Sequence, residues 1–156
     1  MAGPAELTHL LSGIVVPDSS IVIKWFRRAE AGAGQAEALR QAHLEGQLLF
    51  IVPDLLLYEI ANVLRFKSDL DEAAVRSALR SLTQINLEIS PITEPRLQRV
   101  IALAYQHDLT IYDASFITLA EETGGDFVTT DEKLLKKITA LPFCHALANI
   151  AIPGGE

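Results

Sequence analysis

Cysteine is almost missing from this chain of 156 residues: Cys144 stands alone, which excludes an internal disulfide framework and any metal site built from several cysteines. The sequence also lacks an apolar run long enough to span a membrane and a glycine-rich phosphate loop. Its first twelve residues have neither the basic start nor the apolar centre of a secretory signal. We therefore expect a cytoplasmic protein that does not associate with membranes.

The sequence also has few basic residues relative to its acidic ones. Thirteen basic residues face twenty acidic ones, which gives a net charge of −7. Such a balance argues against a protein that holds nucleic acid by a general basic surface. If the partner is a polyanion, bound cations must assist.

Apolar residues make up 49% of the sequence and charged residues 21%, as in an ordinary globular protein. The length favours one domain, which we place at residues 13–150, between a flexible N-terminal lead-in at 1–12 and a C-terminal tail at 151–156. Short β-branched runs predict strands at 14–16, 48–52, 87–90, 126–129 and 146–150. Longer periodic segments predict helices at 19–26, 35–44, 55–67, 95–107, 110–122 and 131–139, and a further helix that begins at Asp69 or Asp71 and ends near 82. This alternation predicts an α/β fold with a mostly parallel central sheet.

Asp18 lies where the first predicted strand hands over to a helix, in the stretch VVPDSSIVIKWF. Open parallel sheets bind ligands at this carboxyl edge, so Asp18 is a candidate site residue. A helix N-cap is the alternative role, because aspartate at that position accepts hydrogen bonds from free backbone N–H groups.

Glu59 is the most informative acid. At about 100° per residue, it falls inside the apolar arc of the helix at 55–67 instead of opposite to it. Ionised carboxylates are rarely buried without a partner, since desolvation costs several kcal/mol. Either Glu59 belongs to a site, or it lies at the rim of the apolar stripe or in an internal salt bridge.

Asp113 and Asp131 repeat these two patterns. Asp113 projects from the apolar arc of the helix at 110–122, although it also lies three residues after Thr110, as in a capping box. Asp131 follows the strand at 126–129 and precedes a helix, so an N-cap role is its alternative.

Taken together, the four acids can meet at one edge of a parallel sheet. Carboxylates gathered without counter-ions repel and raise one another's pKa values, so such a cluster predicts hard divalent cations, Mg²⁺ or Mn²⁺, held by oxygen ligands. Acids with Mg²⁺ indicate phosphoryl chemistry.

Three segments, VVPDSSIVIKWF, VPDLLLYEIANVL and TIYDASFITLAEETGGDFVTTDEKL, carry a family resemblance. In their order and spacing the chain resembles PIN-domain ribonucleases, most closely those of the VapC toxin type. The resemblance spans residues 13–150 and implies a three-layer α/β/α sandwich. It also implies a toxin that cleaves RNA, is inhibited by an antitoxin and forms a homodimer.

The same resemblance makes Asp18, Glu59, Asp113 and Asp131 the catalytic, metal-binding acids. It adds Ser20, Asn62 and Thr130 as supporting polar residues. Five cations near the ends of the two site helices form a candidate RNA-binding rim, with ordinary solvated charge as the alternative: Lys24, Arg27, Arg28, Arg65 and Lys67.

The predicted activity is a Mg²⁺- or Mn²⁺-dependent endoribonuclease that hydrolyses RNA phosphodiester bonds and leaves 5′-phosphate and 3′-hydroxyl ends. Two alternatives remain open at this stage. One is a metal-dependent DNA or flap nuclease of the same fold. The other is a non-catalytic protein-binding module whose acids are helix caps.

Overall fold

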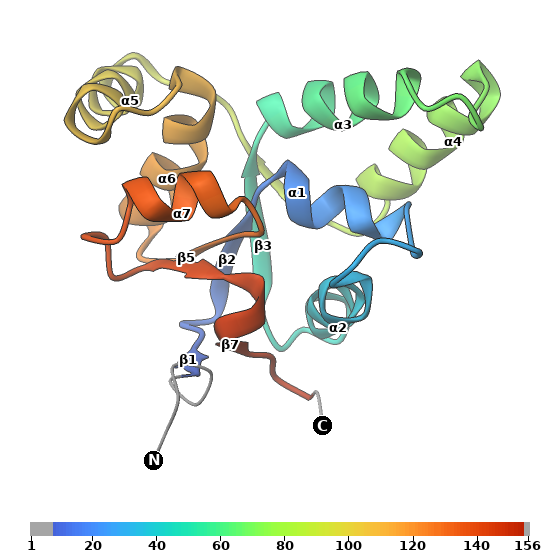
Figure 1. The fold of residues 1–156 in the computed structure, drawn as a ribbon, viewed down its shortest axis with the longest axis horizontal. Helices are drawn as coiled ribbons and strands as arrows, with labels where there is room; N and C mark the ends of the chain where they lie inside the picture. The colour runs from blue at the N-terminus through green and yellow to red at the C-terminus, as the bar shows by residue number, and fades with distance from the viewer. Residues whose placement is uncertain (1–7, 155–156) are drawn as a thin grey trace.

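The computed structural model of the protein describes residues 8–154, and a parallel five-stranded sheet lies at its centre (Figure 1). The strand order is β4-β3-β2-β5-β6, and every neighbouring pair is parallel. The strands are β2 (Ile14–Pro17), β3 (Leu49–Pro53), β4 (Glu88–Ser90), β5 (Asp126–Thr129) and β6 (Cys144–Ala146). Chain order reverses between β2 and β5, which are neighbours in the middle of the sheet. In an open parallel sheet this reversal point is where a ligand site forms.

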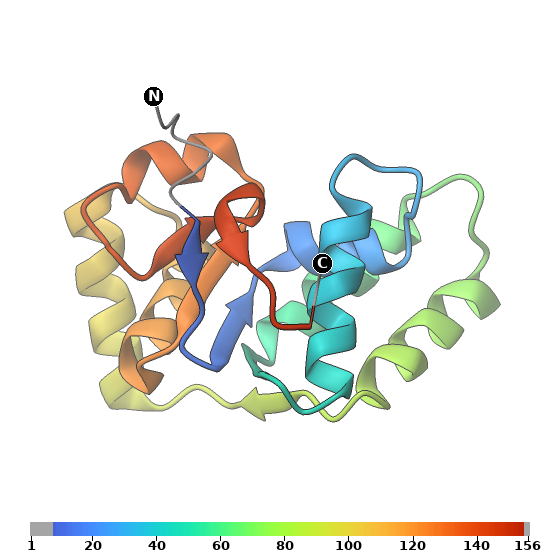
Figure 2. The same cartoon turned by 90° about the horizontal axis from the view of Figure 1, so that it is seen from below.

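Helices cover both faces of the sheet. They are α1 (Ser19–Val22), α2 (Ala33–Leu44), α3 (Leu55–Arg65), α4 (Glu72–Thr83), α5 (Glu94–His107), α6 (Ile111–Thr123) and α7 (Glu132–Lys137). Figures 1 and 2 show α5 and α6 on one side of the sheet and α1 and α2 on the other. The predicted three-layer α/β/α sandwich is therefore confirmed. None of the helices within residues 8–154 is long and apolar enough to cross a membrane.

The core follows from the β-branched and aromatic residues of the central strands. Side chains of β2, β3 and β5 have no solvent exposure at Val15, Val16, Phe50, Phe127 and Val128. Strands buried on both faces are typical of parallel sheets covered by helices, which explains why their sequences are nearly continuous apolar runs.

The first site helix is shorter than predicted. Instead of one helix over 19–26, α1 is followed by a 3₁₀ turn, η2 (Ile23–Trp25). β-Branched residues have a low helix propensity, and tertiary contacts determine the turn. The buried Trp25 indole N–H donates to the carbonyl of Ala36 at 2.9 Å and so ties η2 to α2.

The predicted strand at 146–150 is wrong. Cys144 to Ala146 pair with β5, the chain then turns through η3 (Leu147–Asn149), and β7 (Ile150–Ala151) pairs with β1 (His9–Leu10). The buried Leu147 explains the break, because the 3₁₀ turn directs this side chain into the core.

The N-terminal segment is held near the sheet. Residues 1–7 of the predicted lead-in lie outside the described residues, and β1 begins at His9. Farther along, the Ser12 N–H donates to Oδ2 of Asp126 at 2.7 Å. The other oxygen, Oδ1, lies 2.9 Å from Nε2 of the buried His145. Asp126 thus links the N-terminal segment to β5 and β6 and has a structural role.

Two glycines give a matched test of the packing around β2. A Cβ added at Gly125 would lie 2.7 Å from Ile14 Cγ2 and 2.9 Å from the Ile14 carbonyl oxygen, whereas one added at the exposed Gly34 meets nothing within 4 Å. We expect Gly125→Ala to lower the free energy of unfolding by about 1–3 kcal/mol through overpacking. Gly34→Ala in α2 should raise it by about 0.5–1 kcal/mol. Urea unfolding measures both, and equal effects would contradict the close approach.

Candidate active site

Asp18 lies at the carboxyl end of β2, beside the end of β5, and only 8% of its surface is exposed. Its backbone N–H donates to the carbonyl of Val128 at 3.2 Å. Its carboxylate accepts from the backbone N–H of Ser20 at 3.0 Å and from the Ser20 hydroxyl at 2.5 Å. The Thr129 hydroxyl donates to the other oxygen at 2.5 Å. Asp18 therefore is the predicted N-cap of α1, and its two oxygens are also fixed at the sheet edge.

Burial raises the pKa of Asp18 from 3.8 to about 6, and the hydrogen bonds from Ser20 and Thr129 oppose this rise. At neutral pH the group is mainly ionised. Within the described part of the chain, no lysine or arginine forms an ion pair with Asp18, Glu59, Asp113 or Asp131. A buried anion without a protein cation is costly, so this position favours an external cation.

Glu59 projects from α3 beside the buried Leu56 and Ile60 and is itself half-buried, as the apolar arc predicts. The Ser19 hydroxyl donates to its Oε1 at 2.5 Å. Burial raises the pKa of Glu59; the Ser19 hydrogen bond lowers it, and the negative charge of Asp113 raises it further. The alternative of an internal salt bridge is wrong, because in residues 8–154 the recorded polar partner of this carboxylate is a hydroxyl.

Asp113 lies in the first turn of α6 and is half-buried. Burial raises its pKa, and so does the charge of Asp131, while a hydrogen bond with Thr110 and the charge of Lys137 oppose the rise. The backbone N–H of Asp113 donates to the Thr110 hydroxyl at 3.0 Å, so the predicted capping contact is present. The capping interaction does not remove the charge coupling to the neighbouring acids.

Asp131 is the N-cap of α7, accepting from the N–H of Leu134 at 3.1 Å. Its own N–H donates to the Thr129 hydroxyl at 3.0 Å, the same hydroxyl that donates to Asp18. A single threonine thus joins two acids that are 113 positions apart in the sequence. Asp131 is exposed, whereas Asp18 is buried, so the four acids are graded from the interior to the surface.

Hydroxyl contacts and charge coupling connect all four acids at one edge of the sheet. Even so, among residues 8–154 no three histidine, cysteine or acidic side chains are gathered closely enough to form a metal site. Repulsion between like charges separates carboxylates, and here the hydroxyls of Ser19, Ser20 and Thr129 satisfy the two innermost acids. The donor set consists of hard oxygens, which suits Mg²⁺ or Mn²⁺ and not a soft metal.

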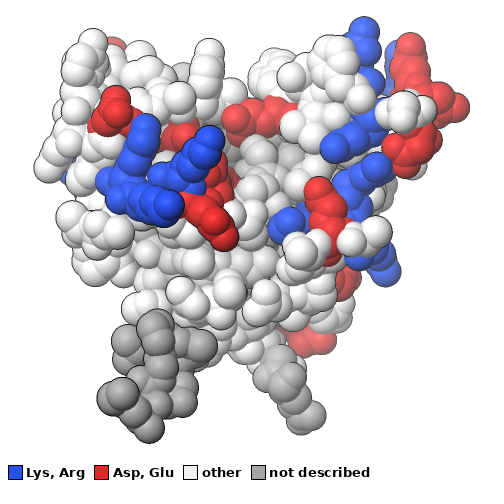
Figure 3. Space-filling view, in the orientation of Figure 1, with Lys and Arg blue, Asp and Glu red and all other residues white. Residues whose placement is uncertain are grey.

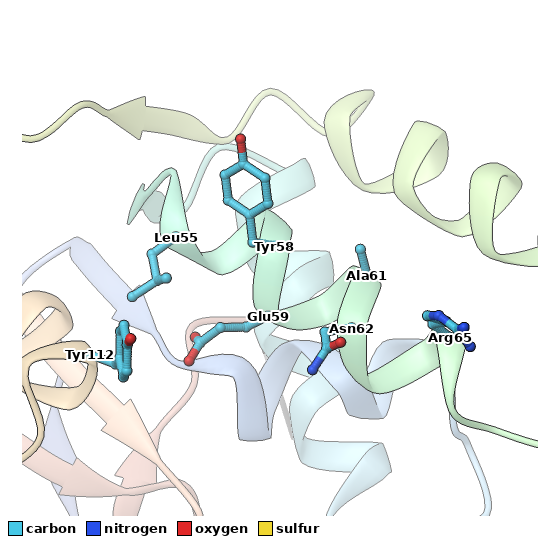
Figure 4. Close-up of a pocket in the computed structure, with 7 residues that line it drawn as sticks. All are labelled: Leu55, Tyr58, Glu59, Ala61, Asn62, Arg65 and Tyr112. Carbon is cyan, nitrogen blue, oxygen red and sulfur yellow. The ribbon is translucent and has the colours of Figure 1, made fainter.

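Two cavities flank the acids. The first, here called the aromatic groove, has a volume of about 560 Å³, runs along α3, and is lined by Leu55, Tyr58, Glu59, Ala61, Asn62, Arg65 and Tyr112 (Figure 4). The second, the lysine pocket, has a volume of about 310 Å³ and is lined by Asp108, Leu109, Thr110, Asp113, Asp131, Lys133, Leu134 and Lys137. Figure 3 shows acidic side chains in and beside the hollow on this side of the molecule, with basic side chains on both flanks.

The supporting residues differ in part from the predicted set. Ser20 contacts Asp18 as predicted, and Asn62 lines the aromatic groove with Glu59. Thr130 contributes its backbone N–H, which donates to the Ser20 hydroxyl at 2.9 Å. Ser19 and Thr129 supply the hydroxyls that sequence reasoning missed. Their positions at a helix start and a strand end were the available signal.

The predicted cationic rim lies mostly elsewhere. Of its five residues, Arg65 lines the aromatic groove, while Arg27 makes a two-bond ion pair with Asp69 at 2.8 and 3.1 Å. Arg28 lines a separate cavity, and neither Lys24 nor Lys67 lines the two cavities beside the acids. The cations that share a cavity with Asp113 and Asp131 are instead Lys133 and Lys137, on the short helix α7.

The chain is similar in sequence to known proteins. The family model of the PIN domain matches residues 15–141. Ribonuclease VapC3 of Pyrobaculum aerophilum is 35% identical over 99 residues, covering 56% of this chain and 70% of that protein. Exonuclease VapC9 of the same organism is 34% identical over 83 residues, covering 53% of this chain and 62% of that protein.

A solved toxin-antitoxin complex from Klebsiella pneumoniae contains a chain of similar fold. The TM-score is 0.62 at 17% sequence identity, over 85% of this chain and 97% of that one. The segment that matches the family model, residues 15–141, contains all four acids and every residue that lines the two cavities beside them.

Proposed function

This chain belongs to the PIN-domain family, and we propose that it is a divalent-metal-dependent endoribonuclease, the toxin of a toxin-antitoxin pair that acts in the cytoplasm. One observation carries the proposal at the site: Asp18 is a buried carboxylate that has no ion pair with a lysine or arginine of residues 8–154, and it is connected to three further acids at the reversal point of the sheet. Membership of the family supports the proposed class of reaction, which is the hydrolysis of phosphodiester bonds.

Asp18, Glu59, Asp113 and Asp131 would hold the cation. When bound, Mg²⁺ or Mn²⁺ supplies a water of lowered pKa and stabilises negative charge on the phosphate and the leaving oxygen. The protein contributes orientation: the Ser20 and Thr129 hydroxyls hold the Asp18 carboxylate, and the Ser19 hydroxyl holds Glu59. Because these donors come from α1 and β5, they are placed by the sheet and not by a loop.

The two lysines of the lysine pocket would attract the phosphate backbone to this edge. Lys137 has a side chain 47% exposed, and its Nζ donates to the Asp108 carbonyl at 2.8 Å. This contact orients the ammonium at the mouth of the pocket that also holds Asp113 and Asp131. These two lysines would place positive charge beside the acids, at the point that a phosphate of a polyanion must reach despite the net charge of −7.

The proposal predicts a specific pattern of substrates and ends. With Mg²⁺ or Mn²⁺, the protein should cut a linear RNA oligonucleotide and also a circular RNA of the same sequence, leaving 5′-phosphate ends, and should lose this activity in EDTA. The matched DNA should stay intact. Gel analysis of end-labelled and circular substrates measures this.

Each alternative has its own result in that assay. Shortening of linear RNA from one end with the circle intact would identify an exonuclease, the activity named for one relative. Cleavage of DNA or of flap structures would identify the other nuclease class. No cleavage of any nucleic acid with either metal would contradict the proposed function.

We further propose an inhibitory antitoxin partner and a homodimer. The toxin-antitoxin complex of similar fold supports the first. Exposed apolar side chains on and before α5, Ile92 and Leu97, give a surface for the second. Co-expression with the adjacent small gene product should give an inactive complex, and sedimentation of the isolated protein measures the dimer.

A further inference from the structure

Three of the four site acids, Glu59, Asp113 and Asp131, line the two cavities, and we call the boundary between the cavities the seam. Tyr112 and Asp113 are successive residues in the first turn of α6, yet Tyr112 lines the aromatic groove and Asp113 lines the lysine pocket. Glu59 lines the groove, and its carboxylate feels the charge of Asp113. A substrate whose reacting phosphate reaches all these acids must therefore extend into both cavities.

The groove side of the seam offers an aromatic face. Tyr112 is 61% exposed, and Figure 4 shows its ring edge-on, with one face directed across the groove toward Leu55 and Glu59. Farther along α3 the groove presents the amide of Asn62 and then the guanidinium of Arg65. Tyr58 is also exposed, but its ring points away from Glu59.

The lysine pocket has a different chemistry. Lys133 and Lys137 line it together with Asp113 and Asp131, the ammonium of Lys137 lies 3.6 Å from the carboxylate of Asp108, and in this pocket none of the lining residues is aromatic. A nucleobase finds no ring to stack on here, whereas a backbone phosphate finds point charges. The two sides of the seam thus match the two parts of a nucleotide chain.

Resting on the proposed ribonuclease function, we propose that the site binds single-stranded RNA along one path: the base next to the scissile phosphate stacks on Tyr112 beside Asn62, and the phosphates on the other side of the cleaved bond lie along Lys133 and Lys137. Base-aromatic stacking needs an unpaired base, because a paired base keeps its faces within the helix. The exposed amide of Asn62 has both a donor and an acceptor for a base edge.

Continuity with the acids favours RNA over a protein ligand in the groove. An apolar peptide would use the groove alone, whereas the seam joins an aromatic face, three of the four site acids and two lysines, contributed by α3 and by the starts of α6 and α7. From the groove to the pocket, these groups match in order a base, the reacting phosphate and the flanking phosphates of an RNA strand.

The first arm of the test combines Tyr112→Leu with a single abasic nucleotide moved along an RNA oligonucleotide that the wild type cleaves at one position. Tyr112→Leu should lower kcat/KM roughly tenfold on the intact oligonucleotide, mainly through KM, as expected for loss of one stacked base. One abasic position beside the cleaved bond should lower the wild-type value similarly. For Tyr112→Leu, kcat/KM on that abasic oligonucleotide should be nearly the same as on the intact one, because the stacking interaction is already lost.

Matched controls isolate the stacking interaction. Tyr112→Phe keeps the ring and should retain the wild-type kcat/KM within about twofold, since stacking needs the π face and not the hydroxyl. Tyr105→Leu makes the same change at an 86% exposed tyrosine on α5, outside the groove, and should leave cleavage unchanged.

The second arm tests the phosphate side. Lys133→Gln and Lys137→Gln should each reduce the slope of log(kcat/KM) against log salt by roughly 0.7, the value for one lost single-strand phosphate contact. Lys136→Gln removes the same charge from the same helix outside the pocket and should leave the slope unchanged.

Two results would overturn the proposed strand path while leaving the ribonuclease function intact. One is a kcat/KM of Tyr112→Leu equal to that of the wild type. The other is an abasic position that lowers kcat/KM by the same factor in both proteins. If Tyr112→Leu cleaves normally but loses the inhibitory protein complex, the groove belongs to a protein partner and the proposal is wrong. Failure of the wild type to cut any RNA would overturn the function itself, and with it the strand path.

Discussion

Asp18→Asn should lower kcat/KM for RNA cleavage by at least about a thousandfold while leaving the fold intact. Charge stabilisation by a bound metal supplies several kcal/mol, and each 1.36 kcal/mol is a factor of ten in rate. Asparagine keeps the size of Asp18 and removes the anionic ligand at the most buried of the four positions. Single-turnover cleavage in saturating Mn²⁺ gives the rate, and circular dichroism confirms folding.

Asp113→Asn and Glu59→Gln should show losses of the same order, because each removes a carboxylate coupled to its neighbour. Two exposed acids provide controls: Glu132→Gln, adjacent to Asp131 on α7, and Asp54→Asn, which precedes α3 and makes no side-chain cap. Both controls should cleave like the wild type. Wild-type rates in the three site variants would show that the acids are structural.

Asp126 shows why controls must come from the structure. In the sequence it is an ordinary acid at the start of a predicted strand. In the fold it is buried, pairs with His145 and accepts from the Ser12 backbone. Asp126→Asn would therefore disturb packing without touching the site. Its carboxylate lies at the amino end of β5, away from the edge where Asp18 and Asp131 meet.

Local signals in the sequence were sufficient to predict where the acids lie in the fold, while their catalytic role stays a proposal. Asp18 and Asp131 are predictable because a carboxylate directly after a β-branched strand lies at the ligand-binding edge of a parallel sheet. Glu59 is predictable because it interrupts an apolar arc. For these residues, the pattern of apolar and polar positions along the sequence is enough to predict the part of the fold in which the side chain lies.

Other features depend on contacts distant in sequence, and no local period contains them. Thr129 joins Asp18 to Asp131 only because β2 and β5 are neighbours in the sheet. Lys133 and Lys137 are ordinary charges of a short helix in the sequence, and only the fold places them in one pocket with Thr110 and Asp113. The wrong strand at 146–150 has the same origin, since pairing with β1 and β5 decides where it divides.

Binding of Mn²⁺ should stabilise the wild type at pH 7.5 by several degrees and much less at pH 5. A cation that binds only the folded state, at a hundred times its dissociation constant, adds about 2.7 kcal/mol, and each kcal/mol shifts Tm by roughly 2–4 °C in a chain of this size. Ligand carboxylates must be ionised, so protonation competes with the metal. Calorimetric scans in EDTA and in saturating Mn²⁺ measure the difference.

The sign of the pH effect follows from Asp18. Its pKa is about 6 in the folded protein against 3.8 for the free group, so between these pH values the folded state binds more protons than the unfolded state. The free energy of unfolding of the metal-free protein should fall as the pH rises from about 4 to about 6, by up to about 3 kcal/mol from this group. Metal binding offsets that loss above pH 6.

Two variants separate this explanation from a general salt effect. Asp18→Asn has no carboxylate to titrate, so in EDTA its stability should vary less between pH 4 and 6 than that of the wild type. Glu59→Gln removes one repelling charge: its metal-free Tm should be no lower than that of the wild type, and its rise with Mn²⁺ should be smaller. Equal rises in the wild type, Glu59→Gln and Glu132→Gln would exclude Glu59 as a metal ligand, because a carboxylate that binds the cation must contribute to its stabilising effect.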